Sequence, residues 1–351
     1  MNLGQIDSNM LIEKNIPEDV QWWDALDSER FSLHGLIVED GKLMRMPSKI
    51  AESVSESVAH LNNHTSGGRL SFITDSPYVA LHCKINGSVM ANMSWSGSGS
   101  FDLYADGKFA GLFHSIPKGS QTEVLYNCPL RPHQFDAGEH HMMMSFPLYA
   151  GVKEIAIGLK EGSTLRAYNP YKDTLPILYY GSSITQGASA SRPAMLYQSY
   201  ISKDTNVDFI NLGFSGSAKG EQEIADYLAG IKCSIFVCDW DHNLNSPERL
   251  REKHYPLYRT FRNAQPDTPI IFISRPDFDT MACASANREV IIESYERAIS
   301  EGDKNVYFID GETIFGEDHR TECTVDHAHP TDLGFFRFYQ ALIPMIQKLL
   351  K

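Results

Sequence analysis

No stretch of this sequence approaches the uninterrupted apolar length that a membrane-spanning helix needs. The N-terminus also lacks the basic and apolar segments of a secretion signal, so we expect a cytoplasmic protein. The six cysteines show no short paired spacing. Their scatter favours free thiols in a reducing compartment over a disulfide framework.

Basic side chains are scarce relative to acidic ones. The chain has 31 lysines and arginines against 44 aspartates and glutamates, which gives a net charge of −13. The negative electrostatic field of this net charge repels nucleic acid and anionic membrane surfaces, and we expect neither as a partner. Hydrophobic residues make up 42% of the 351 positions, which is sufficient for two ordinary globular domains.

The first half of the chain has the pattern of an antiparallel β protein. Residues 1–20 show little pattern and are expected to form a tail, and apolar residues at 50, 54, 58 and 61 fit one helical stripe. Short alternating runs then follow between residues 67 and 159, and Asp106-Gly107 between two of them is a strong hairpin signal. We therefore predict a β-sandwich of the jelly-roll type over residues 21–160.

The second half alternates strands with helices. Residues 161–174 are polar, contain proline and glycine, and are interpreted as a linker. After them, apolar strand-like runs, each followed by a helical pattern, occur at residues 175–180, 207–212, 234–240, 269–274 and 305–310. Alternation of this kind predicts a flavodoxin-like, doubly wound parallel sheet over residues 175–351.

The stretch LPILYYGSSITQG ends a predicted buried strand with a tight turn that carries Ser183. Taken alone, a serine after a strand-ending glycine is ordinary turn chemistry. Asp326 and His329, three residues apart in TVDHAHP, follow the last predicted strand and can supply a carboxylate and a base. Because ligands bind beyond the carboxyl ends of parallel strands, the fold brings these segments to one edge. We therefore predict that Ser183 is a nucleophile, His329 its base and Asp326 the residue that orients the base.

Attack on an acyl carbon also requires donors for the developing oxyanion. Gly216 follows the second predicted strand and Asn243 the third. We assign the oxyanion hole to the backbone amides of Ser183 and Gly216 and the side chain of Asn243. This chemistry requires no cofactor.

At these residues the sequence resembles the SGNH (GDSL-type) hydrolase superfamily. The blocks that carry the resemblance are GSSIT at 181–185, NLGFSGS at 211–217 and DHAHP at 326–330. The chain is also similar to a bacterial subgroup whose N-terminal β-domain bears a Gly-x-Asp-Leu-Tyr motif, present here as SFDLY at 100–104. The resemblance implies a serine esterase, often one that acts on small acyl groups of carbohydrates.

The sequence departs from the superfamily pattern at three places. Ser182 stands where aspartate is usual, and Ser100 replaces the glycine of the β-domain motif. The third block has no literal Gly-x-Asn-Asp and reads CDWDHN at 238–243. The oxyanion role is assigned to Asn243, although the register from the strand end would favour Asp241.

Three side chains near the predicted site are candidates for substrate binding: Arg192, Arg275 and Trp240. Each arginine follows a strand and can either contact a substrate hydroxyl or carboxylate or simply pair with a nearby carboxylate. Trp240 can pack on a sugar ring or lie in the core. Two groups of possible metal ligands are close in sequence: Cys323, Asp326, His327 and His329 form one, and Asp239, Asp241 and His242 the other. Neither spacing matches a strong zinc pattern, so we predict no metal site.

These observations predict a serine esterase that hydrolyses small acyl esters, acetyl above all, of carbohydrate-like or other small polar alcohols. The expected partner is an acylated saccharide or similar small molecule, and a homo-oligomer is left open. The alternatives are a short-chain lipid or aryl esterase with the same triad, an inactive sugar-binding protein on a hydrolase scaffold, and a metallohydrolase.

Overall fold

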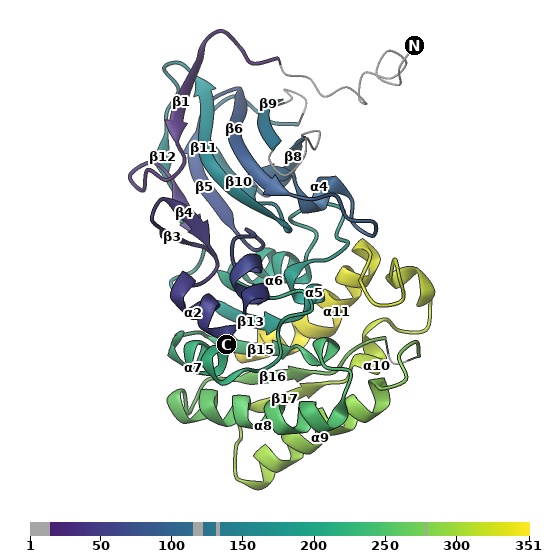
Figure 1. The fold of residues 1–351 in the computed structure, drawn as a ribbon. Helices are drawn as coiled ribbons and strands as arrows, with labels where there is room; N and C mark the ends of the chain where they lie inside the picture. Colours follow the sequence, from purple (N-terminus) through teal and green to yellow (C-terminus); the bar gives the residue numbers. More distant parts are fainter. Residues whose placement is uncertain (1–14, 115–121, 131–133, 278) are drawn as a thin grey trace.

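The computed structural model describes residues 15–114, 122–130, 134–277 and 279–351. Most of the predicted tail, residues 1–14, lies outside these ranges. The chain forms an upper, β-rich region and a lower region in which helices cover a parallel sheet (Figure 1). Two sheets and their shared core make up the upper region, and one five-stranded sheet organises the lower one.

The predicted antiparallel β-sandwich is confirmed. One sheet has the strand order β1 (Val20–Asp24), β11 (Ala150–Lys160), β6 (Tyr78–Gly87) and β9 (Thr122–Pro129). The other has the order β12 (Arg166–Ala167), β5 (Arg69–Thr74), β10 (His140–Ser145), β7 (Phe101–Ala105) and β8 (Lys108–Phe113), with β2 (Ser32–His34) also paired to β5. Alternate residues such as Leu70 and Phe72 of β5 point into one buried core with Leu81 and Cys83 of β6.

The predicted hairpin joins β7 to β8. Asp106 and Gly107 both have positive φ, at 49° and 74°. This is the backbone conformation that a two-residue hairpin turn requires, and aspartate followed by glycine adopts it readily.

The predicted flavodoxin-like sheet is also confirmed. Its parallel strands run in the order β14 (Phe209–Gly213), β13 (Ile177–Gly181), β15 (Ile235–Asp239), β16 (Ile270–Ile273) and β17 (Val306–Ile309). Alternate residues of β13 face two different cores, Leu178 and Tyr180 one of them and Ile177 and Tyr179 the other. The covering helices are α5 (Ser183–Gln186), α6 (Tyr197–Thr205), α7 (Gln222–Gly230), α8 (Pro247–Ala264), α9 (Ala284–Ser300), α10 (Gly311–Ile314) and α11 (Asp332–Leu349).

The two regions are in closer contact than the sequence pattern indicated. The predicted helical stripe forms two short helices, α2 (Ser48–Val54) and α3 (Glu56–Leu61), because Ser55 ends the first and its side chain caps the second at Val58 N. Their residues Ala51 and Val58 are buried in the core of the α/β region. Residues 161–174 are likewise more than a linker, since β12 lies among them and pairs with β5.

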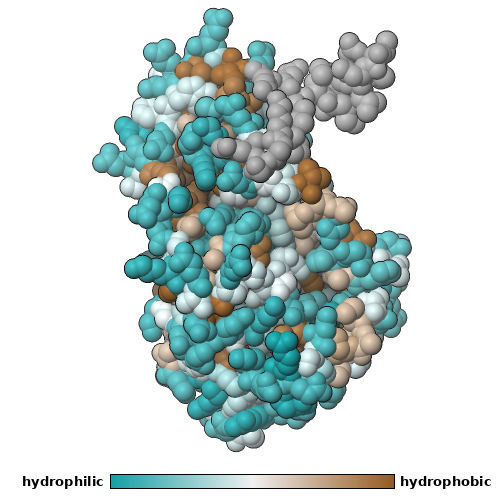
Figure 2. All heavy atoms as spheres, viewed as in Figure 1, coloured by the Kyte–Doolittle hydropathy of each residue, from teal (hydrophilic) through white to brown (hydrophobic). Residues whose placement is uncertain are grey.

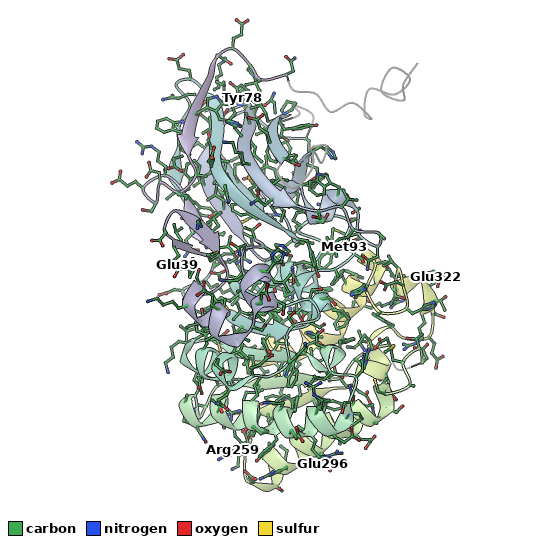
Figure 3. All side chains as sticks on the ribbon, viewed as in Figure 1. Glu39, Tyr78, Met93, Arg259, Glu296 and Glu322 are labelled. Carbon is green, nitrogen blue, oxygen red and sulfur yellow. The ribbon has the colours of Figure 1, made fainter. Side chains whose placement is uncertain are left out.

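A small ribbon of β3 (Ile37–Glu39) and β4 (Lys42–Met44) precedes α2. The short helix α4 (Trp95–Ser98) follows β6 and lies where the upper and lower regions meet, near Met93 (Figure 3). Hydrophilic residues cover most of the lower region on the face drawn in Figure 2, with apolar residues scattered among them. Among the described residues, the structure has no helix with the length and apolarity needed to cross a membrane.

Candidate active site

Ser183 is the first residue of α5 and follows the carboxyl end of β13 directly. Ser182 caps this short helix, and its Oγ accepts a hydrogen bond from Ile184 N at 3.2 Å. The turn needs Gly181, because a Cβ there would lie 2.3 Å from the Asp239 carbonyl oxygen. The serine that replaces the usual aspartate therefore supplies the helix cap that positions Ser183.

The structure brings Ser183, His329 and Asp326 into one hydrogen-bonded row. Ser183 Oγ lies 2.9 Å from His329 Nε2, and His329 Nδ1 lies 2.7 Å from Asp326 Oδ2. Ser183 is buried, at 8% exposure, whereas the His329 side chain is 26% exposed and can meet both substrate and water. This is the geometry with which a histidine takes a proton from a serine hydroxyl.

Backbone contacts between its two ends hold the loop that carries Asp326 and His329. Thr324 pairs with Pro330 in an isolated bridge, and Val325 N donates to the His329 carbonyl oxygen at 2.9 Å. Partial burial disfavours ionisation of Asp326, but hydrogen bonds from the backbone and ring of His329 and from Asn92 outweigh it and lower the pKa of Asp326 to about 2. Asp326 is therefore a carboxylate at neutral pH and can hold the imidazole in one orientation.

Asn92 is a site residue that the sequence analysis missed. It lies between β6 and α4 in the β-sandwich region, and its Nδ2 donates to Asp326 Oδ2 at 2.9 Å and lies 3.4 Å from His329 Nδ1. The Asn92 carbonyl oxygen accepts a hydrogen bond from Ser189 Oγ at 2.8 Å. The β-sandwich region thus contributes directly to the site, through a loop in which no residue pattern marked Asn92.

The predicted oxyanion donors all have an N–H group available for a ligand. The backbone N–H groups of Ser183 and Gly216 donate no hydrogen bond to any atom of the described part of the chain. Gly216 has a φ of 65°, which glycine accepts without strain, and the space beside its Cα is open. Asn243 Nδ2 donates one hydrogen bond to the Phe214 carbonyl oxygen at 3.1 Å, which leaves its second N–H for a ligand.

The structure favours Asn243 over Asp241 as the third donor. The Asp241 side chain is fully buried, and its Oδ2 accepts a hydrogen bond from Arg275 N at 3.1 Å. A carboxylate also cannot donate to an oxyanion. Asn243 lies two residues further along, where the 3₁₀ turn at Asp241–Asn243 brings its amide to the Phe214 carbonyl on the loop that carries Gly216.

The structure contradicts two of the three candidate substrate contacts, Trp240 and Arg275. Trp240 is 1% exposed and stacks on His254, so its indole belongs to the core and cannot meet a sugar ring. Arg275 is 3% exposed and binds Asp277 with two hydrogen bonds of 2.7 and 2.8 Å. Trp240 directly follows β15 and Arg275 lies two residues after β16, and both side chains are buried rather than turned toward a substrate.

Arg192 joins the two regions of the molecule. Its Nη1 donates to the Tyr104 hydroxyl at 2.8 Å and lies 3.4 Å from Asp102 Oδ2, and its guanidinium lies 4.1 Å from the Phe109 ring centroid. Its partners Asp102 and Tyr104 belong to the SFDLY motif. The motif therefore anchors the loop that follows the nucleophile helix.

Within the described ranges, one group of residues could hold a metal ion. Asp239, Asp241 and His242 each place one ligand atom within 4.8 Å of the others. His242 Nε2 also lies 3.5 Å from Asp277 Oδ1. Burial opposes the charge of His242, but the carboxylates of Asp241 and Asp277 raise its pKa to about 9. The imidazolium that results pairs with these carboxylates, and only the neutral ring could bind a metal.

Comparisons with known proteins agree with this architecture and site. Residues 174–347 match the model of the GDSL-like lipase/acylhydrolase family, and residues 20–165 match the GxDLY domain, the N-terminus of SGNH-type esterases. The chain is 32% identical to a protein described as a GDSL-like lipase from Bacteroides ovatus, with a TM-score of 0.83 and coverage of 94% of this chain and 98% of that one. The protein is a hydrolase, and it belongs to the GDSL-like lipase/acylhydrolase family in the group that carries the GxDLY domain.

More distant structures share the fold. The salicylyl-acyltransferase SsfX3 of a tetracycline biosynthetic pathway has a TM-score of 0.76 at 19% identity, and the alignment covers 95% of this chain and 98% of SsfX3. The acetyl xylan esterase Est2A from Butyrivibrio proteoclasticus has a TM-score of 0.58 at 12% identity, with 94% and 99% covered. A search of curated proteins found no match.

Proposed function

We propose that the protein is a serine esterase that removes small acyl groups, acetyl above all, from carbohydrate-like or other small polar alcohols. The observation that carries the proposal is the row of hydrogen bonds from Ser183 Oγ through His329 to Asp326, at 2.9 and 2.7 Å. An inert binding protein would not need this alignment.

The chemistry follows from the positions of these groups. Ser183 Oγ attacks the carbonyl carbon while His329 Nε2 takes its proton, and Asp326 stabilises the imidazolium that forms. The oxyanion accepts hydrogen bonds from the amides of Ser183 and Gly216 and from Asn243. His329 then returns its proton to the departing alcohol, which leaves an acyl group on Ser183. Water, deprotonated by His329, attacks this acyl-enzyme and releases the acid and the free serine.

Two observations support a polar alcohol as the alcohol part of the substrate. Several proteins with this fold are named as carbohydrate esterases, among them the acetyl xylan esterase Est2A. The rim of the site is also polar, because Asn92 and Ser189 lie beside the triad. Hydroxyl groups of a saccharide find partners in such a rim, whereas a long acyl chain does not.

A chain-length series tests the acyl specificity. We expect kcat/KM to be greatest with the p-nitrophenyl ester of acetate and to fall at least tenfold by octanoate, and we expect acetate release from acetylated xylooligosaccharides. A preference for octanoate would support the short-chain lipid esterase instead. Activity that disappears in excess EDTA and survives Ser183→Ala would support the metallohydrolase.

A further inference from the structure

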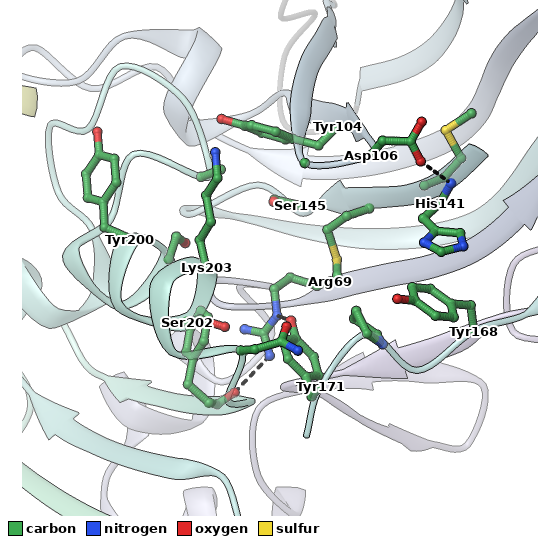
Figure 4. Close-up of a pocket in the computed structure, with 18 residues that line it drawn as sticks. Arg69, Tyr104, Asp106, His141, Ser145, Tyr168, Tyr171, Tyr200, Ser202 and Lys203 are labelled. Carbon is green, nitrogen blue, oxygen red and sulfur yellow. Dashed lines mark hydrogen bonds between the residues drawn. The ribbon is translucent and has the colours of Figure 1, made fainter. Parts of the chain in front are cut away.

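A cavity lies between the β-sandwich and α6. It has a volume of about 400 Å³ and is bounded by β5, β7, β10, α6 and the segment that leads into the parallel sheet (Figure 4). Phe209, the first residue of β14, lines it, whereas Gly213 at the other end of that strand pairs with Gly181 beside the nucleophile turn. The strand separates these ends by roughly 13 Å, so the cavity is distinct from the site at Ser183.

One wall of this cavity presents aromatic faces that are held in place. Tyr168 stacks on His141 with ring centroids 4.3 Å apart, and its backbone carbonyl accepts a hydrogen bond from Ser71. The Tyr171 hydroxyl accepts a hydrogen bond from Arg69 Nε at 2.9 Å. Because these contacts hold both tyrosines in place, a ligand could pack against them without first ordering them.

The opposite wall supplies polar groups and two more tyrosines, Tyr104 and Tyr200, on either side of the Lys203 amino group (Figure 4). Small polar side chains complete the lining: Ser145, Ser199, Ser202 and Asn206. A sugar ring combines apolar C–H faces, which pack on aromatic rings, with hydroxyl groups at its rim, which need donors and acceptors of this kind.

The charges in the cavity leave one cation without a counter-ion. Arg69 pairs with Asp208, and Asp106, on the side of the cavity away from Lys203 (Figure 4), accepts a hydrogen bond from His141 N at 2.9 Å. Lys203 is exposed, its Nζ lies 5.7 Å from the centroid of the Tyr104 ring, and it forms no ion pair with any described residue. A ligand that carries a carboxylate would therefore gain more here than a neutral one.

We propose that this cavity is a second binding site, separate from the catalytic one, for an acidic saccharide, that is, a sugar ring bearing a carboxylate. The ring packs on the wall formed by Tyr168 and Tyr171, and the carboxylate pairs with Lys203. Binding here requires no turnover, so it does not depend on the proposed esterase activity.

Ligand-observed NMR titration of the full chain carrying Ser183→Ala tests the proposal, with glucuronate and glucose as probes. We expect saturable binding of glucuronate that is at least tenfold tighter than that of glucose. Lys203→Met should remove this difference, and Tyr168→Ala should weaken glucuronate binding at least tenfold. Lys348→Met removes the same charge from exposed α11 and should change nothing.

Three results would overturn the proposal. They are the absence of saturable glucuronate binding, equal binding of the two sugars, and glucuronate binding that neither Lys203→Met nor Tyr168→Ala alters. Far-ultraviolet circular dichroism and the melting temperature of each variant show that the fold is retained. A variant that unfolds is replaced by Lys203→Gln or Tyr168→Leu at the same position.

Discussion

Asn92 lies at the point where the β-sandwich region meets the candidate triad. Its amide donates to the Asp326 oxygen that also faces the His329 ring. It touches neither the nucleophile nor the predicted oxyanion donors. We therefore expect a positioning role, in which Asn92 fixes the carboxylate so that the imidazole points at Ser183.

Replacing Asn92 with alanine should lower kcat for p-nitrophenyl acetate about tenfold and leave KM within twofold. The lost hydrogen bond to a charged group is worth about 1.5 kcal/mol, which corresponds to a tenfold change in rate if the loss falls on the transition state. Steady-state kinetics measure kcat and KM separately. A matched substitution, Asn263→Ala at an exposed position of α8, should leave both constants unchanged. A rise in KM alone would contradict the positioning role.

His254 is a residue whose burial should make stability depend on pH. Burial lowers its pKa to about 4, whereas an unfolded histidine titrates near 6.5. The unfolded chain therefore binds a proton first as the pH falls, and stability is lost between pH 6.5 and 4. His34 shifts in the same direction, while His242, whose pKa is about 9, loses its contribution only as the pH rises from 6.5 to 9.

We expect His254→Phe to remove part of the acid sensitivity. Between pH 7 and pH 5 the free energy of unfolding should fall by about 2 kcal/mol more in the native protein than in the variant, at 1.36 kcal/mol per pKa unit. Urea titrations at the two pH values measure this difference. Equal acid sensitivity of both proteins would show that His254 titrates normally in the folded state.

Single residues divide into those that the sequence could predict and those that it could not. Ser183, Asp326 and His329 come together because the end of a parallel strand fixes where each of them lies. Asn92 belongs to the other region of the chain and is 234 positions from Asp326, so no spacing could have indicated it. Trp240 and Arg275 were misplaced because a sequence does not show which way a side chain turns at the end of a buried strand.

At the scale of elements, the loop after α5 is tied to the β-sandwich. Asp102 is completely buried, and its Oδ2 accepts a hydrogen bond from Ala194 N at 2.9 Å. Burial raises the pKa of Asp102 to about 6, although Ala194 N and Arg192 offset part of the shift. The carboxylate thus links a β-strand to the segment that leads from the nucleophile helix to α6.

Removing this link with Asp102→Ala should destabilise the protein by about 3 kcal/mol, because a buried N–H and a guanidinium lose their partner. Chemical denaturation at pH 7 measures the change. Asp173→Ala removes an exposed carboxylate instead and should cost less than about 0.5 kcal/mol. Equal stability of the two variants would mean that Asp102 does not hold the loop.

The elements themselves were largely predictable. All five parallel strands lie within a residue or two of the apolar runs that indicated them, since a strand buried on both faces is apolar throughout. The pairing of β12 with β5 could not be predicted, because a strand of two residues, an arginine and an alanine, is too short to show an alternating pattern. The break between α2 and α3 also depends on the single cap at Ser55.

At the scale of the whole molecule, the two regions share a buried boundary. Arg45 is 2% exposed, its Nη2 donates to the Leu61 carbonyl oxygen at 2.6 Å, and its guanidinium lies 4.4 Å from the Phe214 ring centroid. Nη1 also donates to the Gly213 carbonyl oxygen in the sheet that carries the site. A cation buried at this boundary has partners only while both regions are folded.

We expect the chain to unfold in one cooperative transition. Differential scanning calorimetry should show a single peak whose calorimetric and van't Hoff enthalpies agree. Residues 175–351 alone should lack native near-ultraviolet circular dichroism, because the surface that packs on α2 and α3 would be exposed. Two separate peaks, or a folded isolated segment, would contradict this view.

The acyl-enzyme at Ser183 is the central claim, and one measurement tests it most directly. Native protein and the Ser183→Ala variant are treated with a serine-directed phosphonate, digested and analysed by mass spectrometry, with p-nitrophenyl acetate hydrolysis measured in parallel. We expect the label on Ser183 in the native protein, none in the variant, and a fall in kcat of at least 10³-fold. Unchanged hydrolysis in the folded variant, or a native protein that neither turns over nor takes the label, would contradict the claim.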